Sequence, residues 1–260
     1  MIVLAADQLR ARRVTHTTTA LGLLALAVMY LAFFPSIEDQ LSSFSEDLPD
    51  SLTAFIGDAD FSTANGYLRS QVYSLVSPLL LCGVAIAAGA GLARTERDQT
   101  LTTTFVMPVR RREIAGAWII VVCVLAAVGS AAEVVGAVVG GKIAGTDVGI
   151  DRVLLATAAL HELAALAGAV AVAVSAVTGS PGAALGVAWG VIGGSFLVTS
   201  VSNLVNGLSW LGSLSPWSWY GTGEAVEGPY DVLGLVLLIA AWVAAVVIAV
   251  GAFERRDLQL

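Results

Sequence analysis

Charged residues are scarce in this chain of 260 residues: they make up 13% of it, whereas hydrophobic residues make up 57%. A soluble globular domain carries about 25% charged residues. The mean hydropathy of +0.84 points the same way. The composition therefore predicts an integral membrane protein and excludes the large classes of soluble enzymes and soluble binding modules.

Cysteine and histidine are also scarce, with two of each. Cys82 and Cys123 lie inside apolar runs, so we read them as small buried hydrophobic residues and not as a disulfide. His161 and Glu162 begin like the zinc-protease pattern H-E-x-x-H, but Ala165 stands where the second ligand is needed. The sequence predicts no metal site and no metalloprotease.

Long apolar runs, by contrast, recur along the whole chain. Each has about the 20 residues that an α-helix needs to cross about 30 Å of hydrocarbon. We expect six spans, the first of them ended by Pro35: Thr17–Phe34, Gln71–Leu92, Ile114–Gly140, Val153–Val177, Ala183–Val205 and Val232–Phe253. The prediction is an all-α polytopic membrane protein in which residues 1–260 form a single transmembrane domain.

Four segments outside these runs have a character of their own. They are an amphipathic N-terminal helix at 1–13, an acidic outer cap at 36–69, a basic inner segment at 94–113 and an outer aromatic segment at 206–231. We expect the cap to be partly helical. The aromatic segment follows a polar end of the fifth span and is rich in turns, so we expect it to be partly re-entrant.

The sidedness follows from how the basic residues are distributed. An even number of spans places both termini on one side, and the segments of that side hold ten of the thirteen basic residues and six of the twenty acidic ones. The segments of the other side hold three basic and twelve acidic residues. Because basic loops stay inside, both termini are predicted to be cytoplasmic.

The polar stretch between the second and third spans is the longest that carries a basic cluster. It opens with Thr95 and Asp98, the spacing of a helix N-cap with an acid in the first turn. It is compatible with a helix as far as Val106, and Pro108 ends it. We expect a short cytoplasmic helix that contacts a partner, and the alternative is an ordinary basic loop.

Two acids, Glu133 and Glu162, lie within the expected spans. An ionised carboxylate at the membrane centre costs at least about 2.5–3.5 kcal/mol, so each must be paired, protonated or in water. One interpretation is a polar path for a substrate, with His161 near Glu133. The other is a structural hydrogen bond between the third and fourth spans.

The stretch Gly136–Ile143 nearly matches the phosphate-binding pattern G-x-x-x-x-G-K-[ST]. Ile143 replaces the hydroxyl that holds Mg²⁺, no strand precedes the stretch, and the charge distribution places it outside the cell. We read it as the end of the third span, where glycines let a neighbouring helix approach. The chain itself is expected to hold no cofactor.

Glycines also recur at every fourth position of the fifth span. They form one smooth helix face, suited to close packing in the membrane or across a subunit boundary. The residues are Gly182, Gly186, Gly190 and Gly194.

Two parts of the chain resemble a known family, and the resemblance covers nearly the whole chain. Glu96, Thr100, Leu101, Pro108, Val109, Arg110 and Arg111 resemble the pattern E-x-x-x-[TS]-L…P-[VL]-x-R that follows the second span in type-2 ABC transporter permeases. Residues 215–232, followed by a span and the ending FERRDLQL, resemble the C-terminal part of actinobacterial drug and antibiotic exporters in that family.

The resemblance implies a half-transporter in a bacterial plasma membrane that exports a hydrophobic or amphipathic small molecule: a drug, an antibiotic or a lipid-like compound. Such a permease pairs with a second copy of itself or a sister permease. It is not an enzyme, because ATP and Mg²⁺ belong to separate cytoplasmic ABC ATPase subunits. Membrane lipid is a further expected partner, and nucleic acid is not.

In such a permease the segment after the second span is the coupling helix, here about Glu96–Met107, and residues 1–13 would also touch the ATPase. The expected ATPase-coupling residues are Glu96, Thr100, Leu101, Phe105, Met107, Pro108, Arg110 and Arg111.

A second hypothesis is a proton- or ion-coupled secondary transporter that uses Glu133, His161 and Glu162. Such folds usually contain inverted repeats and broken helices near the midplane, and we find no convincing repeat here. A membrane-embedded enzyme is disfavoured because no complete catalytic set is present.

Overall fold

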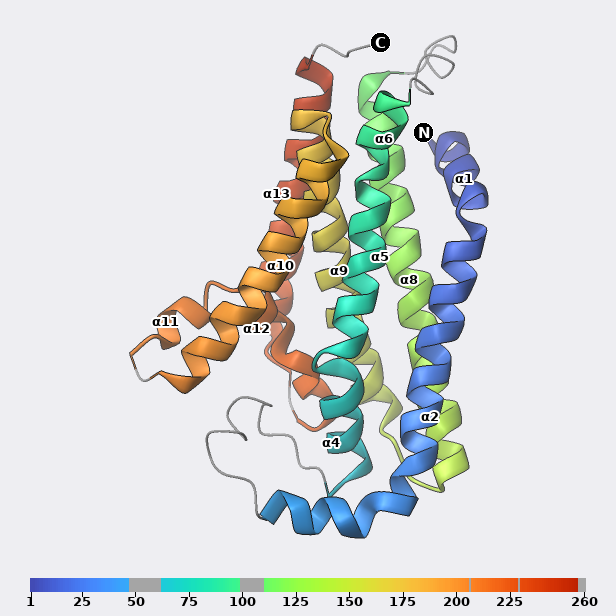
Figure 1. Cartoon of the computed structure of the whole chain (residues 1–260), viewed down its shortest axis with the longest axis vertical. Helices are drawn as coiled ribbons and strands as arrows, with labels where there is room; N and C mark the ends of the chain where they lie inside the picture. Colours follow the sequence, from blue (N-terminus) through green and yellow to red (C-terminus); the bar gives the residue numbers. More distant parts are fainter. Residues whose placement is uncertain (47–61, 99–109, 206, 229, 257–260) are drawn as a thin grey trace.

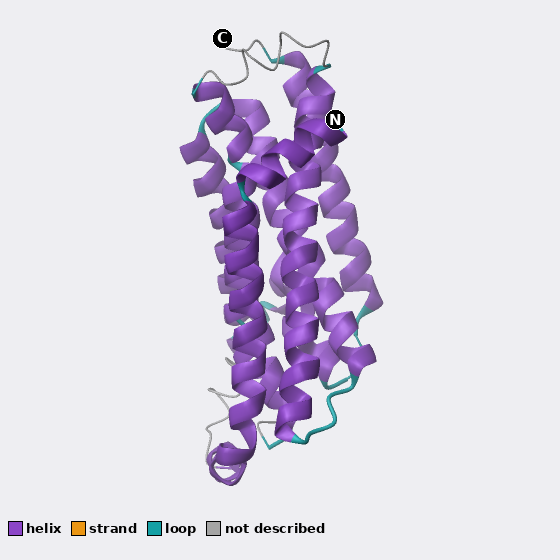
Figure 2. Cartoon of the chain, turned by 90° about the vertical axis from the view of Figure 1, so that its right-hand side faces the viewer, coloured by secondary structure: helices purple, strands orange, loops and turns teal. Residues whose placement is uncertain are grey.

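The computed structural model describes residues 1–46, 62–98, 110–205, 207–228 and 230–256. Throughout these residues the chain forms helices and connecting turns, without a strand (Figure 2). Six helical stretches are long and apolar enough to cross a membrane. The all-α fold with six candidate spans is thus confirmed, and the long helices lie side by side as one elongated bundle (Figure 1).

The first span does not end where the sequence predicts. α1 covers Ile2–Ala11, and α2 runs from Arg13 to Glu46, with Pro35 inside it. Proline lacks an N–H and crowds the preceding turn, but a helix can accept both as a bend. Figure 1 shows α2 turning from along the bundle to across its end. The prediction that Pro35 ends the helix is therefore wrong.

The second span is assembled from four short pieces. They are α4 (Ala64–Leu68), the π-helix η1 (Arg69–Tyr73), α5 (Val76–Gly89) and α6 (Gly91–Arg97). Leu75 leaves the helical region, with φ −142° and ψ −49°, so the hydrogen-bond ladder breaks between η1 and α5. Within α5, Pro78 follows closely and supplies no N–H to repair the break.

The predicted helix start at Thr95 is also wrong. Thr95 lies inside α6, and its hydroxyl donates to the carbonyl oxygen of Leu92 at 2.8 Å. Thr95 is therefore an interior residue of a helix that begins at Gly91, and not the residue before a new helix. Asp98 is the residue that ends α6. The second span therefore extends about one turn further than its hydropathy suggests.

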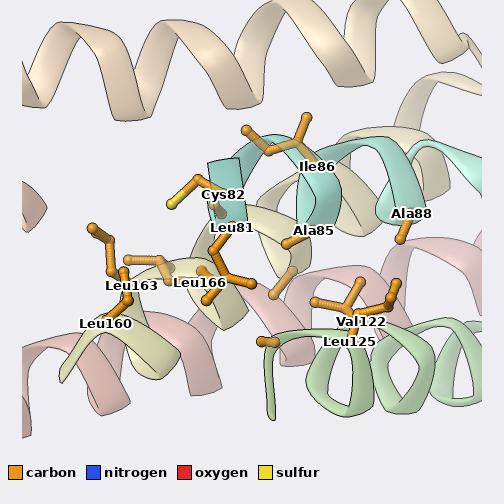
Figure 3. Packing of buried hydrophobic residues seen from close by; sticks show 14 of the residues in the cluster. Leu81, Cys82, Ala85, Ile86, Ala88, Val122, Leu125, Leu160, Leu163 and Leu166 are labelled. Atoms are coloured by element: carbon orange, nitrogen blue, oxygen red, sulfur yellow. The ribbon is translucent and has the colours of Figure 1, made fainter. Parts of the chain in front are cut away.

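Two long helices form the centre of the bundle: α8 (Arg111–Ala144) and α9 (Ile150–Thr178). Their contact with α5 is built from small and branched apolar residues (Figure 3). At Gly168 of α9 an added Cβ would collide with Val122 of α8 and come within 3.0 Å of the Ala85 carbonyl of α5. Such small residues let membrane helices approach closely, which is what drives their association.

The last third of the chain holds two spans with a folded segment between them. α10 covers Pro181–Leu204 and α13 covers Val232–Arg255. The segment between them contains α11 (Ser209–Gly212), α12 (Pro216–Tyr220) and the 3₁₀-helix η2 (Gly221–Val226). Figure 1 shows α11 projecting from the side of the bundle, whereas α12 returns to it.

The returning segment is buried deeply. Trp217 and Tyr220 are 1% and 0% exposed. Tyr220 donates its hydroxyl to the carbonyl oxygen of Tyr73 at 2.8 Å, and the Tyr73 hydroxyl bonds to that of Thr157 at 2.7 Å. Thr157 lies seven residues into α9, about 10 Å from its start. The returning segment is thus bonded to the second span and, through the Tyr73 side chain, linked to α9.

Candidate functional site

The residues at which α6 ends and α8 begins are joined to two other helices by one arginine. We call this group the Arg256 cluster: Glu96 of α6, Arg111 of α8, Ser175 and Ala176 of α9, and Arg256 directly after α13. These elements lie at the end of the bundle that also carries α1 (Figure 1).

The Arg256 guanidinium forms a close ion pair with Glu96, whose side chain is 5% exposed. Its Nη1 also donates to the carbonyl oxygens of Ser175 and Ala176, at 3.0 and 3.2 Å. Those carbonyls belong to the last turn of α9, where a cation is favourable, and the Ser175 oxygen also accepts from the Gly179 N–H at 2.9 Å. The backbone oxygen of Arg256 accepts from Nη1 of Arg111 at 2.6 Å.

The turn after α9 is shaped to admit this arginine. Gly179 ends the helix with φ +65°, a left-handed conformation that favours glycine. A Cβ on Gly179 would lie 2.9 Å from two guanidinium nitrogens of Arg256. Glycine is therefore required here both for the backbone turn and for space.

Most of the expected coupling residues lie outside the part of the chain that the structure describes. Arg110 precedes α8, and its N–H donates to the carboxylate of Glu113 at 3.2 Å, which caps the start of the helix. The residues that lie outside the described part of the chain are Thr100, Leu101, Phe105, Met107 and Pro108. Of the predicted set, the structure brings together Glu96 and Arg111, through Arg256.

The N-terminal helix is held against the same end of the bundle. The Arg12 guanidinium lies over the Trp118 ring of α8, 5.1 Å from its centroid. Burial, and secondarily the charge of Arg94, lowers the pKa of Arg12 from its usual value. Gly91 at the start of α6 lies against both Arg12 and Trp118 and leaves no room for a Cβ. α1, α6 and α8 are thus packed as one unit.

Within the bundle, Glu133 of α8 is fully buried, and neither carboxylate oxygen has a hydrogen-bond partner in the described residues. Ser77 of α5 lies beside it, and Ser130 lies one turn earlier on α8; both hydroxyls are buried and unpartnered. We call these three residues the Glu133 site. An unpartnered buried carboxylate is rare enough in folded proteins to require an explanation.

The structure does not join the three residues of the predicted polar path. His161 and Glu162 are half-buried on α9. Glu162 lies close enough to Cys123 of α8 to act on it electrostatically. Among the described residues, no ion pair or hydrogen bond links either of them to Glu133. The polar path therefore stays a prediction, with Glu133 as its buried member.

At the opposite end of the bundle, a second buried arginine holds the returning segment. Arg69 of η1 is 8% exposed and pairs with Glu227 at 2.6 Å and Glu224 at 3.7 Å. Arg152 of α9 donates to the Glu227 carbonyl at 2.7 Å. The π-helix, α9 and the segment after α12 are thereby connected.

The glycine face of α10 has little or nothing packed against it. An added Cβ at Gly186, Gly190 or Gly194 would meet no atom within 4 Å, and at Gly182 only the Ser180 hydroxyl at 3.9 Å. The described residues therefore leave this face almost uncovered, and its role in close helix packing in the membrane stays a prediction. Contact with another subunit remains the prediction.

Sequence reasoning missed the two arginines that organise the ends of the bundle. Arg256 reads as one of several basic residues flanking the last span, and Arg69 as an isolated charge in an acidic segment. The signal that could have found Arg69 is its sign, because it is a cation on the side that is predicted to be acidic. Nothing local distinguishes Arg256 from Arg255.

The site geometry can be set against known families. The family described as "Multidrug efflux system permease Rv1217c, C-terminal domain" matches residues 5–256, nearly the whole chain. No curated protein matches. With six candidate spans and this match, the chain is a multi-pass membrane permease. It belongs to the family defined by the C-terminal domain of the multidrug efflux permease Rv1217c.

Proposed function

We propose that this chain is the transmembrane subunit of an ATP-driven ABC exporter in a bacterial plasma membrane. It moves a hydrophobic or amphipathic small molecule outward, as a dimer with a second copy or a sister permease. ATP and Mg²⁺ are bound by cytoplasmic ATPase subunits, and residues 94–113 are the segment that contacts them. The family match supports the efflux role, and the Arg256 cluster supports the coupling to an ATPase.

The Arg256 cluster is the observation that carries the proposal. Residues 99–109 are flanked by Asp98 and Arg110, and both flanks lie next to members of the cluster, Glu96 and Arg111. A push on this segment is therefore passed directly to α9 and to the end of α13. Coupling needs such a rigid connection, because an ATPase subunit can move the spans only through elements that do not yield.

The ends of the bundle support the predicted sidedness. The end that carries α1, the end of α6, the start of α8 and the end of α13 also carries the ten basic residues assigned to the inside. The opposite end carries the acidic residues around Arg69 and Arg152. This arrangement supports cytoplasmic termini and a cytoplasmic residue 94–113 segment.

The experiment that tests the coupling uses Phe105→Ala in the full chain, co-expressed with its proposed ATPase subunit. Burying a phenylalanine side chain contributes about 1.5–3 kcal/mol, so its loss should weaken ATPase recovery roughly 10- to 100-fold. Phe33→Ala is the matched control, because Phe33 is 61% exposed on α2 and faces outward from the bundle. Unchanged recovery and unchanged transport per ATP in Phe105→Ala would reject the proposed coupling segment.

The dimer is tested on the free glycine face. Gly186→Leu meets open space within the subunit, so the fold should be retained while association of two permeases is lost. Gly168→Leu is the contrasting variant, because it collides with Val122 and should damage the subunit itself. A dimer of wild-type strength in Gly186→Leu would mean that this face is covered by lipid.

The alternative, a proton- or ion-coupled transporter, is kept for one observation: the buried Glu133 lies beside a broken helix, an arrangement typical of secondary transporters. Transport by sealed vesicles decides between the two. Export that requires ATP and continues when the proton gradient is dissipated supports the ATP-driven function. Export that runs on an imposed gradient without ATP supports the alternative.

A further inference from the structure

The Glu133 site has no function in the coupling described above. Its carboxylate is completely enclosed, and no arginine, lysine or histidine bonds to it in the described residues. Four basic side chains form ion pairs or contacts with backbone carbonyls at the ends of the bundle: those of Arg69, Arg111, Arg152 and Arg256. An ion pair therefore does not account for the buried acid.

The surroundings of the site are apolar on the sides formed by α2 and α5. Gly129, one turn before Glu133, lies against Leu81 of α5 and Leu23 of α2. Gly136, one turn after it, lies against Leu24 and Ala27 of α2. Residues of α8 four and three positions from Glu133 share its face, so the carboxyl group points into the same contact. An ionised carboxylate there would be without solvent and without a counter-charge.

Polar groups reach the site from α5 and from the returning segment. Ser77 and Ser130 present hydroxyls that nothing else uses. The titratable groups that face Glu133 electrostatically are Tyr73 of η1 and Tyr220 of α12. Both tyrosine hydroxyls already donate or share hydrogen bonds elsewhere, with Thr157 and with the Tyr73 carbonyl. The site therefore offers neutral hydrogen-bonding groups and no cation.

The site also adjoins the weakest point of the second span. The π-helix η1 ends at Tyr73, the ladder breaks at Leu75, and Ser77 lies in the first turn after the break. Single-turn π-helices occur frequently at functional sites because they can shift register. A rearrangement of this break would move Ser77 relative to Glu133 and open the site.

We propose that Glu133 is a proton-binding site: in the described conformation it holds H⁺ as a neutral carboxylic acid, with Ser77 as its polar neighbour on α5. Binding adds one proton from water to one carboxylate oxygen, and no other bond changes. Loss of that proton leaves an ionised carboxylate among leucine side chains. Burying such a charge without solvent or a counter-charge is energetically unfavourable. The proton is therefore released only when the break between η1 and α5 rearranges.

A proton fits the Glu133 site better than a metal ion does, for a geometric reason. A monovalent metal ion needs several oxygen ligands arranged around it, and the enclosed oxygens here are one carboxylate and two serine hydroxyls. Neither carboxylate oxygen of Glu133 is accessible to solvent. A proton needs a single lone pair and no space. The same limit excludes a bound substrate in this conformation.

The test is an infrared comparison of the full chain in lipid nanodiscs at neutral pH. The wild-type spectrum should contain the C=O stretching band of a protonated carboxylic acid, and Glu133→Gln should lose it. Glu162→Gln is the matched control, because Glu162 is a half-buried acid of the neighbouring helix. Its spectrum should keep the band assigned to Glu133. Glu133→Asp should shift the band, which keeps the test valid should the glutamine variant fold poorly.

Two outcomes would overturn the proposal. Loss of carboxylate bands, not the acid band, in Glu133→Gln would show that the group is ionised. Carboxylate bands that change on addition of Na⁺ would identify a metal-cation site instead. The inference does not depend on the energy source: an exporter that fails to co-purify with an ATPase would reject the proposed function and leave the infrared result standing.

Discussion

Glu96 and Glu133 are both buried glutamates, at 5% and 0% exposure, yet their surroundings are opposite. Glu96 lies at the end of the bundle and is paired with Arg256, which also binds the end of α9. Glu133 lies within the bundle and has no hydrogen-bond partner among the residues that the structure describes. One acid is held by a fixed counter-charge, and the other is surrounded by leucines and free hydroxyls.

The comparison shows two ways in which a membrane protein can bury an acid. A permanent ion pair fixes the relative position of the elements that supply it, so it suits a connection that must transmit force. An unpaired acid can be buried only in its neutral form, so its environment remains able to change when a proton arrives or leaves. The rigid acid lies near the proposed ATPase contact, and the unpaired acid lies next to the broken second span.

The largest effect is expected from Arg256→Ala, which leaves Glu96 buried without its counter-charge. Breaking a buried pair by removing one partner costs about 3–5 kcal/mol, because the remaining charge is uncompensated. The carbonyls of Ser175 and Ala176 also lose the guanidinium that donates to them. Denaturant unfolding in detergent micelles measures the change. Arg255→Ala, at the last residue of α13, is the control and should unfold like the wild type.

A smaller effect separates the two acids directly. Glu96→Gln removes the charge from a charge-assisted contact and should lower the free energy of unfolding by about 1.5–3 kcal/mol. Glu133→Gln replaces a neutral acid by an amide of nearly the same shape, so its effect at neutral pH should be clearly smaller. The two variants are compared in one unfolding assay. Equal losses would remove the distinction between the paired and the unpaired acid.

Ser77→Ala sharpens the comparison further. If Glu133 is a neutral acid, the serine hydroxyl contributes only an uncharged hydrogen bond, worth about 0.5–1.5 kcal/mol. If Glu133 were ionised, the same hydroxyl would be its nearest donor, and its loss would cost about 1.5–3 kcal/mol. Ser70→Ala serves for comparison, because its hydroxyl donates only to the Tyr67 carbonyl. A loss in the higher range would indicate a charged Glu133.

The sequence predicts the six spans well because each span is a local feature of the chain. Only the packing between spans depends on residues that are far apart in the sequence. Length and hydropathy are properties of each run by itself, so six spans follow without knowledge of their contacts. The boundaries are less certain for a local reason: Pro35 bends α2 without ending it, and Thr95 bonds back into α6. Pro35 can either end a helix or bend it, and Thr95 can stand either before a helix or inside one. Tertiary packing decides between these alternatives.

The candidate sites are predicted unevenly for the same reason. Glu133 is found from the sequence because a lone acid in a span is informative by itself. Arg256 and Glu96 are 160 positions apart, and no pattern within either segment announces their contact. The break at Leu75 has only Pro78 as a local sign, and this proline lies three residues later. Contacts between distant segments therefore had to come from the structure.

The smallest expected effect concerns Tyr230, a half-buried acid outside the spans that also keeps its proton. Its hydroxyl donates to the Trp219 carbonyl at 2.6 Å, and burial, followed by the charges of Asp231 and Glu224, raises its pKa to about 12. An unfolded tyrosine has a pKa of about 10. The folded state therefore binds the proton more tightly, so this contribution is complete below about pH 10 and is lost as the pH rises towards 12. Tyr230→Phe should flatten the fall in stability between pH 10 and pH 12. An unchanged pH dependence in that variant would show that Tyr230 ionises in the folded protein as it does in the unfolded chain.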